Sequence, residues 1–561
     1  MTHSREDPFT IEIIQNSLAA ISDEMFEVIR RTAMSPIIYE ALDYSVSITD
    51  GDGNMLTQGN GVPVFLGVMD SLVGEILERY RDEPIRPGDI FVSNDPYGGG
   101  STHLSDIAVI SPVFFDNQLI AFVVNKSHFT EVGGKDPGSW TTNAVEVFQE
   151  GLQLPYLKLF SEGCVNQSIV SLLEANVRLP QMTLGDLWAG VAANRVGTRR
   201  MHDLIGKYGL STFIVACRAL LNYGERSVCT EINNLPKGTY CAEDVIDDDG
   251  LGNGPFPIKV RVDISENDFT VDFSGSNAQV PGPINASRTA TESGVRAIFK
   301  ALTNPNIPAN AGCFRPLNVI CPAGTVFTAD RPAPVSLYWE TIMAAADLIW
   351  KALAPHIPER LPAGHFLSVC GTMISGTHPI TREYFLMVEP LVGGWGASFN
   401  ADGQNGQFAS ADGETYNIPI EILETLYGIR ATQYGFHNED GGHGQYRGGK
   451  GVVLELEILA EDATLTASFG RHASKPWSVG GAASGTNNRI EIERLDGSID
   501  THAMPSRVPL FQGDRLRLIT GTGGGYGDPH LRDPNSVKLD LVDGYITADQ
   551  SLKYYLIDSG D

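Results

Sequence analysis

The sequence predicts a mixed α/β (α+β) fold, divided into several domains with mixed sheets, helical middle segments and a strand-rich C-terminal region. The 561 residues are enough for several folding units of about 150 residues each. Sixty glycines indicate many tight turns rather than a helical bundle. Changes of pattern along the chain suggest an N-terminal α/β region at 1–235, a central α+β region at 236–430 and a strand- and glycine-rich region at 431–561.

A long amphipathic helix is expected near the N-terminus. Apolar residues recur there at the three- and four-residue spacing of one helix face: Ile14, Leu18, Ile21, Met25 and Val28. Thr10 is a suitable N-cap, and Ser35-Pro36 ends the pattern. Short strands should follow at 43–66 around the turn DGDGN, and a second helix at 69–81.

The next stretch, residues 90–129, alternates apolar runs with turn residues, which predicts a strand, a glycine loop and a hairpin. Further on, Thr183 should cap a helix that contains LWAGVAANRV, and FIVACRALLNYG should form another apolar helix. The hairpin is the segment on which we expect the chemistry to depend.

Strands dominate residues 237–285, where KVRVDI and DFTVDFSG should form an antiparallel pair. Helices return near 288–303 and 340–354. After about residue 365 the chain is rich in strands and glycine loops, and a short helix is expected near 547–556.

Composition excludes several classes of protein. The net charge of −28 and the pI near 4.8 disfavour a nucleic-acid partner, because a polyanion is repelled without a basic patch. Seven cysteines without a CxxC pair form neither a disulfide framework nor a zinc ribbon, which is typical of a reducing compartment. No secretory leader and no apolar run of about 18 residues is found, so we expect a cytoplasmic protein without membrane contact.

The hairpin brings a carboxylate and an imidazole together. If Asp116, Asn117 and Gln118 form a three-residue loop, Asp106 lies opposite His128 with Cβ atoms about 5 Å apart. His103 can join them from the glycine loop. Two imidazoles and one carboxylate suit a divalent metal such as Zn, Mn or Fe.

Ordinary roles for these residues remain open at this point. His103 and His128 could be simple hydrogen-bonding residues, with Asp106 capping a turn. A two-residue loop would also flip the parity of the pairing and weaken the convergence.

Two further carboxylates are candidate catalytic residues. Glu131, three residues after His128, could support a metal ligand or act as general base, although a solvated loop carboxylate is the ordinary alternative. Asp43, in ALDYSVSITD, lies at a helix-to-strand junction from which a carboxylate could reach a pocket. It could equally cap a turn.

The glycine-rich loops do not match nucleotide sites. Residues 444–451 fit G-x-x-x-x-G-K, but Gly451 replaces the Ser or Thr that binds magnesium, and a strand-like run follows. GTGGGYGDP has Tyr526 where the dinucleotide pattern needs glycine. No G-x-S-x-G elbow and no cysteine nucleophile motif is found. The chain itself is therefore not expected to bind ATP.

Long motifs in order along the chain resemble the hydantoinase B/oxoprolinase family: SNDPYGGGSTHLSD, NKSHFTEVGGKDPGS, VRLPQMTLGDLWAGVAAN, VDFSGSNAQVPGPIN, GGWGASFNADG, GHGQYRGGKG and GGGYGDPHLRDP. The resemblance implies a hydantoinase A-type partner that binds ATP with Mg²⁺, in a hetero-oligomer such as A2B2, while the B-type chain completes the substrate site. The family includes N-methylhydantoinases, 5-oxoprolinase, lactam-opening enzymes and the related acetone and acetophenone carboxylases.

The resemblance also bears on the metal ligands. The carboxylase branch holds its metal with a His-x-x-Asp pair and a later His, and the matching positions here are His103, Asp106 and His128. Family members commonly carry a second His and an Asp after the last ligand. This sequence has Phe129 and Glu131 there, which leaves the metal's identity open.

The function implied is the B-type subunit of an ATP-dependent hydrolase that opens a cyclic amide such as a hydantoin or lactam. Phosphorylation of the amide oxygen, or of a bicarbonate that assists, would drive attack on an otherwise poor electrophile. An ATP-dependent ketone carboxylase subunit is the alternative enzyme, and a scaffold subunit with a structural metal is the non-enzymatic alternative.

Overall fold

The computed structural model describes residues 7–558. Helix α1 (Pro8–Thr32) opens the chain and buries four of the five residues of the predicted apolar face: Ile14, Leu18, Ile21 and Met25. Its N-cap is Asp7, whose carboxylate accepts from the backbone N–H groups of Phe9 and Thr10. The predicted cap at Thr10 is therefore wrong, because the aspartate three residues earlier presents its oxygens to the free N–H groups. A short helix, α2 (Pro36–Tyr39), follows Ser35.

A seven-stranded antiparallel sheet forms the N-terminal region, in the order β2-β1-β5-β4-β3-β6-β7. Its strands are β1 (Tyr44–Asp50), β2 (Met55–Gly61), β3 (Ile90–Ser93), β4 (Asp106–Phe115), β5 (Gln118–His128), β6 (Leu157–Ser161) and β7 (Cys164–Val165). The central pair β4–β5 is almost fully buried, which explains its continuous apolar runs.

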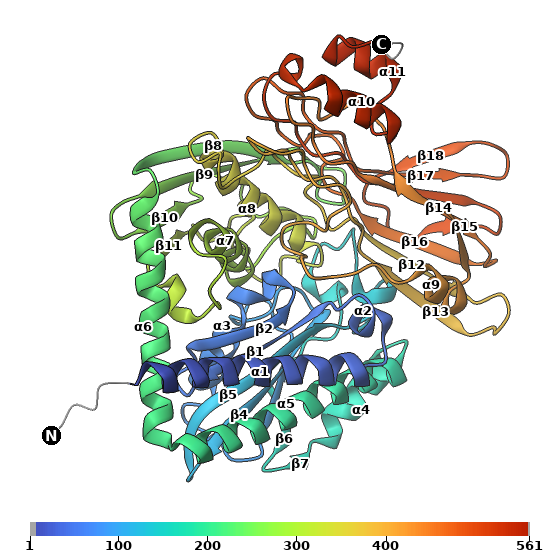
Figure 1. Ribbon diagram of the computed structural model, residues 1–561. Coiled ribbons are helices and arrows are strands. Elements are labelled where there is room, and N and C mark those ends of the chain that lie inside the picture. Colours follow the sequence, from blue (N-terminus) through green and yellow to red (C-terminus); the bar gives the residue numbers. More distant parts are fainter. Residues whose placement is uncertain (1–6, 559–561) are drawn as a thin grey trace.

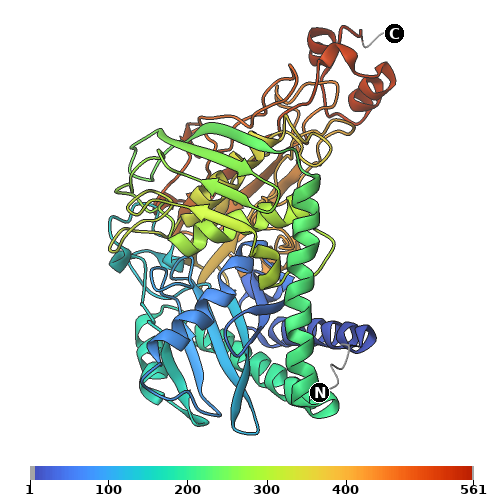
Figure 2. The ribbon, with the colours of Figure 1, turned by 90° about the vertical axis from the view of Figure 1, so that its left-hand side faces the viewer.

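Helices cover this sheet and connect it to the rest of the molecule. α1 and α5 (Pro180–Tyr208) pack against each other and contact one side of the sheet, and α3 (Met69–Arg79) contacts β1 and β5. α4 (Gln167–Asn176) precedes α5. α6 (Leu210–Asn234) runs from the seven-stranded sheet along the side of the four-stranded sheet that residues 238–320 form (Figures 1 and 2).

Thr183 does not cap α5. The helix begins at Pro180, and the Thr183 side chain donates to the backbone carbonyl of Glu131. Proline at the first helical position explains the earlier start, since its missing N–H costs nothing there.

A mixed four-stranded sheet, ordered β11-β10-β9-β8, forms the central region. It contains β8 (Gly238–Ile246), β9 (Phe256–Ile264), β10 (Phe269–Asp272) and β11 (Leu317–Ile320). β9 and β10 pair antiparallel as predicted, and β10 pairs parallel with β11.

Two helices of the central region belong to the molecular core. α7 (Arg288–Thr303) packs on α8 (Tyr338–Leu353), and α8 also contacts β8 and β9. Both helices lie within a residue or two of the predicted ranges. Only Lys351 of α8 escapes full burial, so α8 is surrounded by protein on every side.

The chain after α8 forms two further sheets. One has the order β13-β12-β16-β19, with β12 (Gly371–Thr377), β13 (Tyr384–Glu389), β16 (Ala463–Ser468) and β19 (Val508–Leu510). The other has the order β14-β15-β20-β17-β18, with β14 (Ile429–Phe436), β15 (Val452–Ile458), β17 (Arg489–Glu493), β18 (Ile499–His502) and β20 (Arg515–Ile519).

Small helices complete this region. α9 (Ile420–Leu426) precedes β14, and α10 (Pro534–Val542) and α11 (Ala548–Gln550) lie at the far end of the molecule (Figure 1). α11 begins at a capping box of Thr547 and Gln550, where a short helix was predicted.

The division at 235 and 430 stays a prediction, and the strand pairing bears on it. Residue 235 follows the last residue of α6. The sheet β13-β12-β16-β19 joins strands from both sides of residue 430. Between residues 7 and 558, no single helix is long and apolar enough to cross a bilayer. α5 and α6 together would be long and apolar enough, but the pair is bent by 107°.

Candidate metal centre

The hairpin β4–β5 pairs Asp106 with His128, as the sequence predicts. The predicted three-residue loop is wrong, however, because Phe115 pairs with Gln118 and only Asp116 and Asn117 form the turn. Both have positive φ, at 49° and 63°, which is the backbone of a type I′ turn.

A bulge restores the register that the shorter turn would have shifted. Val113 pairs with Ala121 and Phe114 with Leu119, so Ile120 is an extra residue on β5. Beyond the bulge every pair follows the predicted register, and the side chains of Asp106 and His128 share one face.

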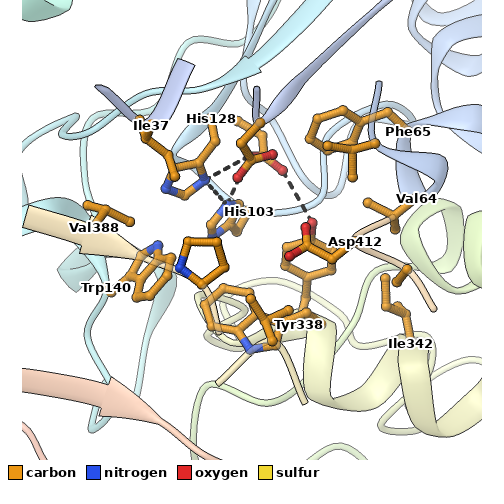
Figure 3. Close-up of a pocket in the computed structure, with 17 residues that line it drawn as sticks. Ile37, Val64, Phe65, His103, His128, Trp140, Tyr338, Ile342, Val388 and Asp412 are labelled. Carbon is orange, nitrogen blue, oxygen red and sulfur yellow. Dashed lines mark hydrogen bonds and ion pairs between the residues drawn. The ribbon is translucent and has the colours of Figure 1, made fainter. Parts of the chain in front are cut away.

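Three buried side chains converge at the end of this hairpin (Figure 3). His103 Nε2 lies 3.0 Å from Asp106 Oδ1 and 3.2 Å from His128 Nδ1, and His128 Nδ1 lies 3.1 Å from Asp106 Oδ1. Ligand atoms at about 2.1 Å from a metal and at right angles to one another lie about 3.0 Å apart. The cluster therefore has the spacing of three neighbouring ligands of one divalent ion.

The hydrogen bonds around His103 support this assignment. Its Nδ1 lies 3.1 Å from the backbone carbonyl of Ser336, which can only accept, so in neutral His103 the proton is on Nδ1. The Nε2 lone pair then faces the Asp106 carboxylate with no hydrogen between them. Two acceptors in contact repel each other unless a cation lies between them, so the residues fit a metal ion.

The second oxygen of Asp106 is held by donors. The Thr102 hydroxyl donates to Oδ2, Tyr338 Oη lies 3.4 Å away, and Lys126 Nζ lies 3.8 Å away. Burial opposes ionisation of Asp106, but the positive charges of protonated His103 and of Lys126 outweigh it and hold the pKa of this carboxyl well below its ordinary value. Asp106 therefore presents an ionised Oδ1 to the cluster.

Lys126 was not expected from the sequence. It is fully buried on β5 and donates to Thr102 Oγ1 at 2.7 Å. Burial lowers its pKa to about 8, against the raising effect of Asp106 and Asp43. The available signal is its position two residues before His128, which places both side chains on the same strand face.

The cluster opens into a small cavity of about 40 Å³ lined by 17 residues (Figure 3). Trp140, Tyr338 and Trp339 form an aromatic part of its wall. The Tyr338 ring centroid lies 5.0 Å from that of His103, and the Trp140 centroid lies 5.6 Å from that of His128. Aromatic walls exclude water and strengthen every charge interaction in the cavity.

Two carboxyls face the cavity beside the cluster. Asp43 immediately precedes β1, and its backbone carbonyl accepts from the N–H of His128 at 3.0 Å. Burial raises the pKa of Asp43 to about 8, with Asp412 and Asp106 adding to the effect and His128 opposing it. Burial likewise raises the pKa of Asp412 to about 7. One oxygen of Asp412 has no hydrogen-bond partner, so it is available to a bound molecule.

Glu131 does not line the cavity. Its Oε1 accepts from the backbone N–H of Gly133 at 2.8 Å and from Arg178 Nη1 at 3.1 Å. Burial raises the pKa of Glu131, while Arg178 opposes that shift. The structure thus brings Asp43, the two histidines and Asp106 to one cavity and ties Glu131 to the loop behind it.

Asp412, Tyr338 and the two tryptophans could not be placed from the sequence. They come from segments more than 200 residues from the hairpin or from an irregular loop, and no local pattern marks them. Only tertiary packing brings them to the metal cluster.

Comparison with known proteins adds independent findings. A family profile described as hydantoinase B/oxoprolinase matches residues 7–529. The B component of a putative D-/L-hydantoinase from Pseudomonas sp. (strain NS671) is 30% identical over 571 residues, covering 98% of this chain and 95% of that protein. The beta component of caprolactamase from Pseudomonas jessenii is 30% identical over 99% of this chain and 97% of its own length.

Solved structures resemble the whole chain. The crystal structure of the ATP-dependent caprolactamase from Pseudomonas jessenii superposes with a TM-score of 0.93 and 28% identity, covering 100% of this chain and 98% of that chain. The nucleotide-free structure of acetone carboxylase superposes with a TM-score of 0.92 over 98% of this chain and 79% of that chain. Its identity of 20% shows a shared fold alone.

Proposed function

The chain belongs to the hydantoinase B/oxoprolinase family, and from this premise we propose that it is the B-type subunit of an ATP-dependent hydrolase that opens cyclic amides. The observation that carries the proposal is the buried His103–Asp106–His128 cluster beside two further carboxyls in one cavity. Two relatives that align over nearly their full length are components of a putative hydantoinase and of a caprolactamase. Both enzyme names indicate cyclic amides as substrates.

His103, Asp106 and His128 would hold the divalent ion, and Zn, Mn and Fe all accept such ligands. When bound, the ion supplies Lewis-acid chemistry, which polarises a carbonyl and makes water a better nucleophile near neutral pH. Thr102, Lys126 and Tyr338 hold the far oxygen of Asp106, and the Ser336 carbonyl fixes the tautomer of His103. These contacts orient Asp106 and His103 before any ion arrives.

Asp43 and Asp412 are the residues that would move protons. Ring opening needs a base to take a proton from water and an acid to protonate the amide nitrogen as it leaves. Both carboxyls line the cavity, and with pKa values of about 8 and 7 each can exchange a proton near neutral pH. The two carboxyls therefore provide both functions without Glu131.

A partner chain is part of the proposal. Each of the two relatives is one component of an enzyme with more than one kind of chain, so the present chain acts in a hetero-oligomer. For its partner we propose an A-type chain that binds ATP with Mg²⁺, in an arrangement such as A2B2. ATP activates the amide, directly or through bicarbonate, because an unstrained amide is a poor electrophile. We also propose a cytoplasmic location, consistent with seven unpaired cysteines.

A ketone carboxylase is the second candidate, favoured by the shared fold with acetone carboxylase. A scaffold with a structural metal is less consistent with the site, since the described residues offer three ligands beside an open cavity rather than a closed set of four.

The fate of carbon separates the two enzymes. The complex with its partner, ATP and labelled bicarbonate should convert a hydantoin or lactam to the ring-opened acid without retaining the label, and it should consume ATP in step with product. Stable label in a β-keto acid formed from a ketone, with cyclic amides inert, would replace hydrolysis by carboxylation.

A further inference from the structure

A second cavity, of about 390 Å³, adjoins the metal cavity. Residues 63–65 and 410–412 form the boundary between the two cavities. The middle residue of each segment, Val64 or Ala411, lines both cavities, whereas Phe65 and Asp412 line only the metal cavity. The N–H of Val64 donates to the carbonyl of Ala411 at 3.2 Å, so the two segments meet at this boundary.

Helix α8 runs along both cavities. Ile342 lines the metal cavity, while Ala346 and Trp350, one and two turns further on, line the larger cavity. With a rise of 1.5 Å per residue, Ala346 lies about 6 Å and Trp350 about 12 Å along the axis from Ile342. The larger cavity therefore extends away from the metal cluster along one face of α8.

The sizes of the two cavities suit different parts of a ligand. A cavity of about 40 Å³ holds no more than about three water molecules, so it has no room for a ring of five to seven atoms. The larger cavity, at about 390 Å³, is within the usual range for small-molecule sites. A cyclic substrate with its carbonyl at the metal cluster must have most of its ring outside the smaller cavity.

The lining of the larger cavity is mainly apolar, with two cations that already have partners. Lys300 Nζ donates to the carbonyls of Asn304 and Ile307, and Arg360 donates to the carbonyl of Leu302 and pairs with Glu231. The cavity thus offers hydrocarbon surface rather than an unpaired charge.

We propose that the larger cavity receives the hydrocarbon part of the substrate, with the amide carbonyl directed across the Val64–Ala411 boundary to the metal cluster. This inference rests on the proposed function and narrows its substrate class to cyclic amides that carry an apolar ring or an apolar substituent. The binding energy comes from apolar surface removed from water along α7 and α8.

The test uses the complex with its partner and ATP. The substrates are a series of hydantoins in which the ring carbon that is not a carbonyl carries hydrogen, methyl, ethyl, n-propyl or n-butyl. For the wild type, kcat/KM should rise by about fourfold per methylene, the factor expected for burying one CH₂ group. Ala346→Leu and Ala297→Leu each add three carbons to the cavity wall. Each should lower kcat/KM progressively more along the series, by at least about tenfold for the butyl compound.

Ala20→Leu, the same substitution at an exposed position of α1, should leave the whole series unchanged. Metal content and the thermal unfolding midpoint of each variant show whether the site and fold are retained. If a cavity variant lost the same factor in kcat/KM for every hydantoin, the cavity assignment would be overturned while ring opening would stand. A wild-type kcat/KM that does not change with alkyl length would have the same consequence. A wild-type complex that opens no cyclic amide would overturn the proposed function, and this inference with it.

Discussion

His103 and Asp106 show how one hydrogen bond decides the chemistry of a cluster. The Ser336 carbonyl fixes the proton of neutral His103 on Nδ1, so the Nε2 lone pair faces the carboxylate 3.0 Å away. In a buried cavity this repulsion is unscreened by water, and a cation removes it. The position of a residue more than 200 positions from the hairpin therefore sets the ligand character of His103.

Loss of one ligand should empty the site without unfolding the chain. We expect His128→Ala to lower bound metal by at least about tenfold and to abolish turnover, because two remaining ligands hold a divalent ion poorly. The fold should persist, since the large core does not depend on one ligand. Elemental analysis of the purified complex measures the metal, with His530→Ala at an exposed position as control. Full metal content in His128→Ala would remove the assignment.

Asp43 and Glu131 can be separated by paired substitutions. Asp43→Asn should lower kcat by about 10²- to 10⁴-fold, the usual cost of removing a positioned base. Glu131→Gln should lower kcat by less than about tenfold, because the glutamine oxygen can still accept hydrogen bonds from Gly133 and Arg178. Steady-state kinetics at equal metal content measure both. A Glu131→Gln variant as slow as Asp43→Asn would restore Glu131 as the base.

At the scale of elements, the β4–β5 hairpin depends on its turn. Asp116 and Asn117 both have positive φ, a conformation that glycine adopts freely and a β-branched residue does not. Asn117→Gly should leave stability unchanged or slightly higher, whereas Asn117→Val should cost about 1–2 kcal/mol. Thermal unfolding of the two variants measures the difference. Equal midpoints would show that the turn has another backbone conformation.

Glu389, at the end of β13, is a buried carboxyl that makes stability depend on pH. Its oxygens accept from Asn417 and the N–H of Ile418, and burial raises its pKa to about 8. A carboxyl with a raised pKa binds its proton more tightly in the folded chain. The contribution of Glu389 to the free energy of unfolding is therefore complete below the pKa of the carboxyl in the unfolded chain, near 4.5. This contribution is lost as the pH rises through about 8, the pKa in the folded chain.

Glu389→Gln should remove this dependence, because an amide keeps the accepting oxygen and never ionises. The variant should match the wild type near pH 5 and have the higher unfolding midpoint near pH 9. Glu421→Gln, at an exposed position of α9, is the matched control and should follow the wild type at both pH values. A Glu389→Gln midpoint below the wild type at pH 9 would contradict the raised pKa.

At the scale of the whole molecule, the glycine loops serve packing. A Cβ on Gly449 would lie 1.8 Å from the carbonyl oxygen of Gln404, and one on Gly451 would lie 2.0 Å from that of Thr520. Backbone segments from distant parts of the sequence are therefore in direct contact, and β15 rather than a helix follows Gly451. This arrangement leaves no room for a phosphate and no helix N-terminus to bind one.

The isolated chain should therefore not bind ATP tightly. Calorimetry of the purified chain with ATP and Mg²⁺ should give no micromolar affinity, whereas the complex with its partner should bind and hydrolyse ATP. Micromolar binding by the chain alone would place a nucleotide site here and would remove the reason for assigning ATP to the partner.

The sequence by itself determined many of the elements of this protein and the three side chains of its candidate metal cluster. Helical spacing predicted α1 and α7, and strand alternation predicted the β9–β10 pair, because these patterns reflect burial of one local face. The pairing of Asp106 with His128 could also be predicted, although the turn and the compensating bulge could not. The predicted loop was one residue too long, and the bulge at Ile120 was not predicted. The two errors cancelled, because the register of Asp106 and His128 depends only on the total number of residues between them.

Tertiary structure decided the rest of the site. Asp412, Tyr338 and Trp339 reach the cavity from distant segments, and Glu131 turns away because Arg178 binds its carboxylate. The cavity along α8 likewise exists only once α7, α8 and two loops are packed together. Periodicity records which local face is buried, but it does not record which other segment covers that face. The three candidate ligands and Asp43 could therefore be selected from the sequence, whereas Asp412, the aromatic wall and the apolar cavity required the folded chain.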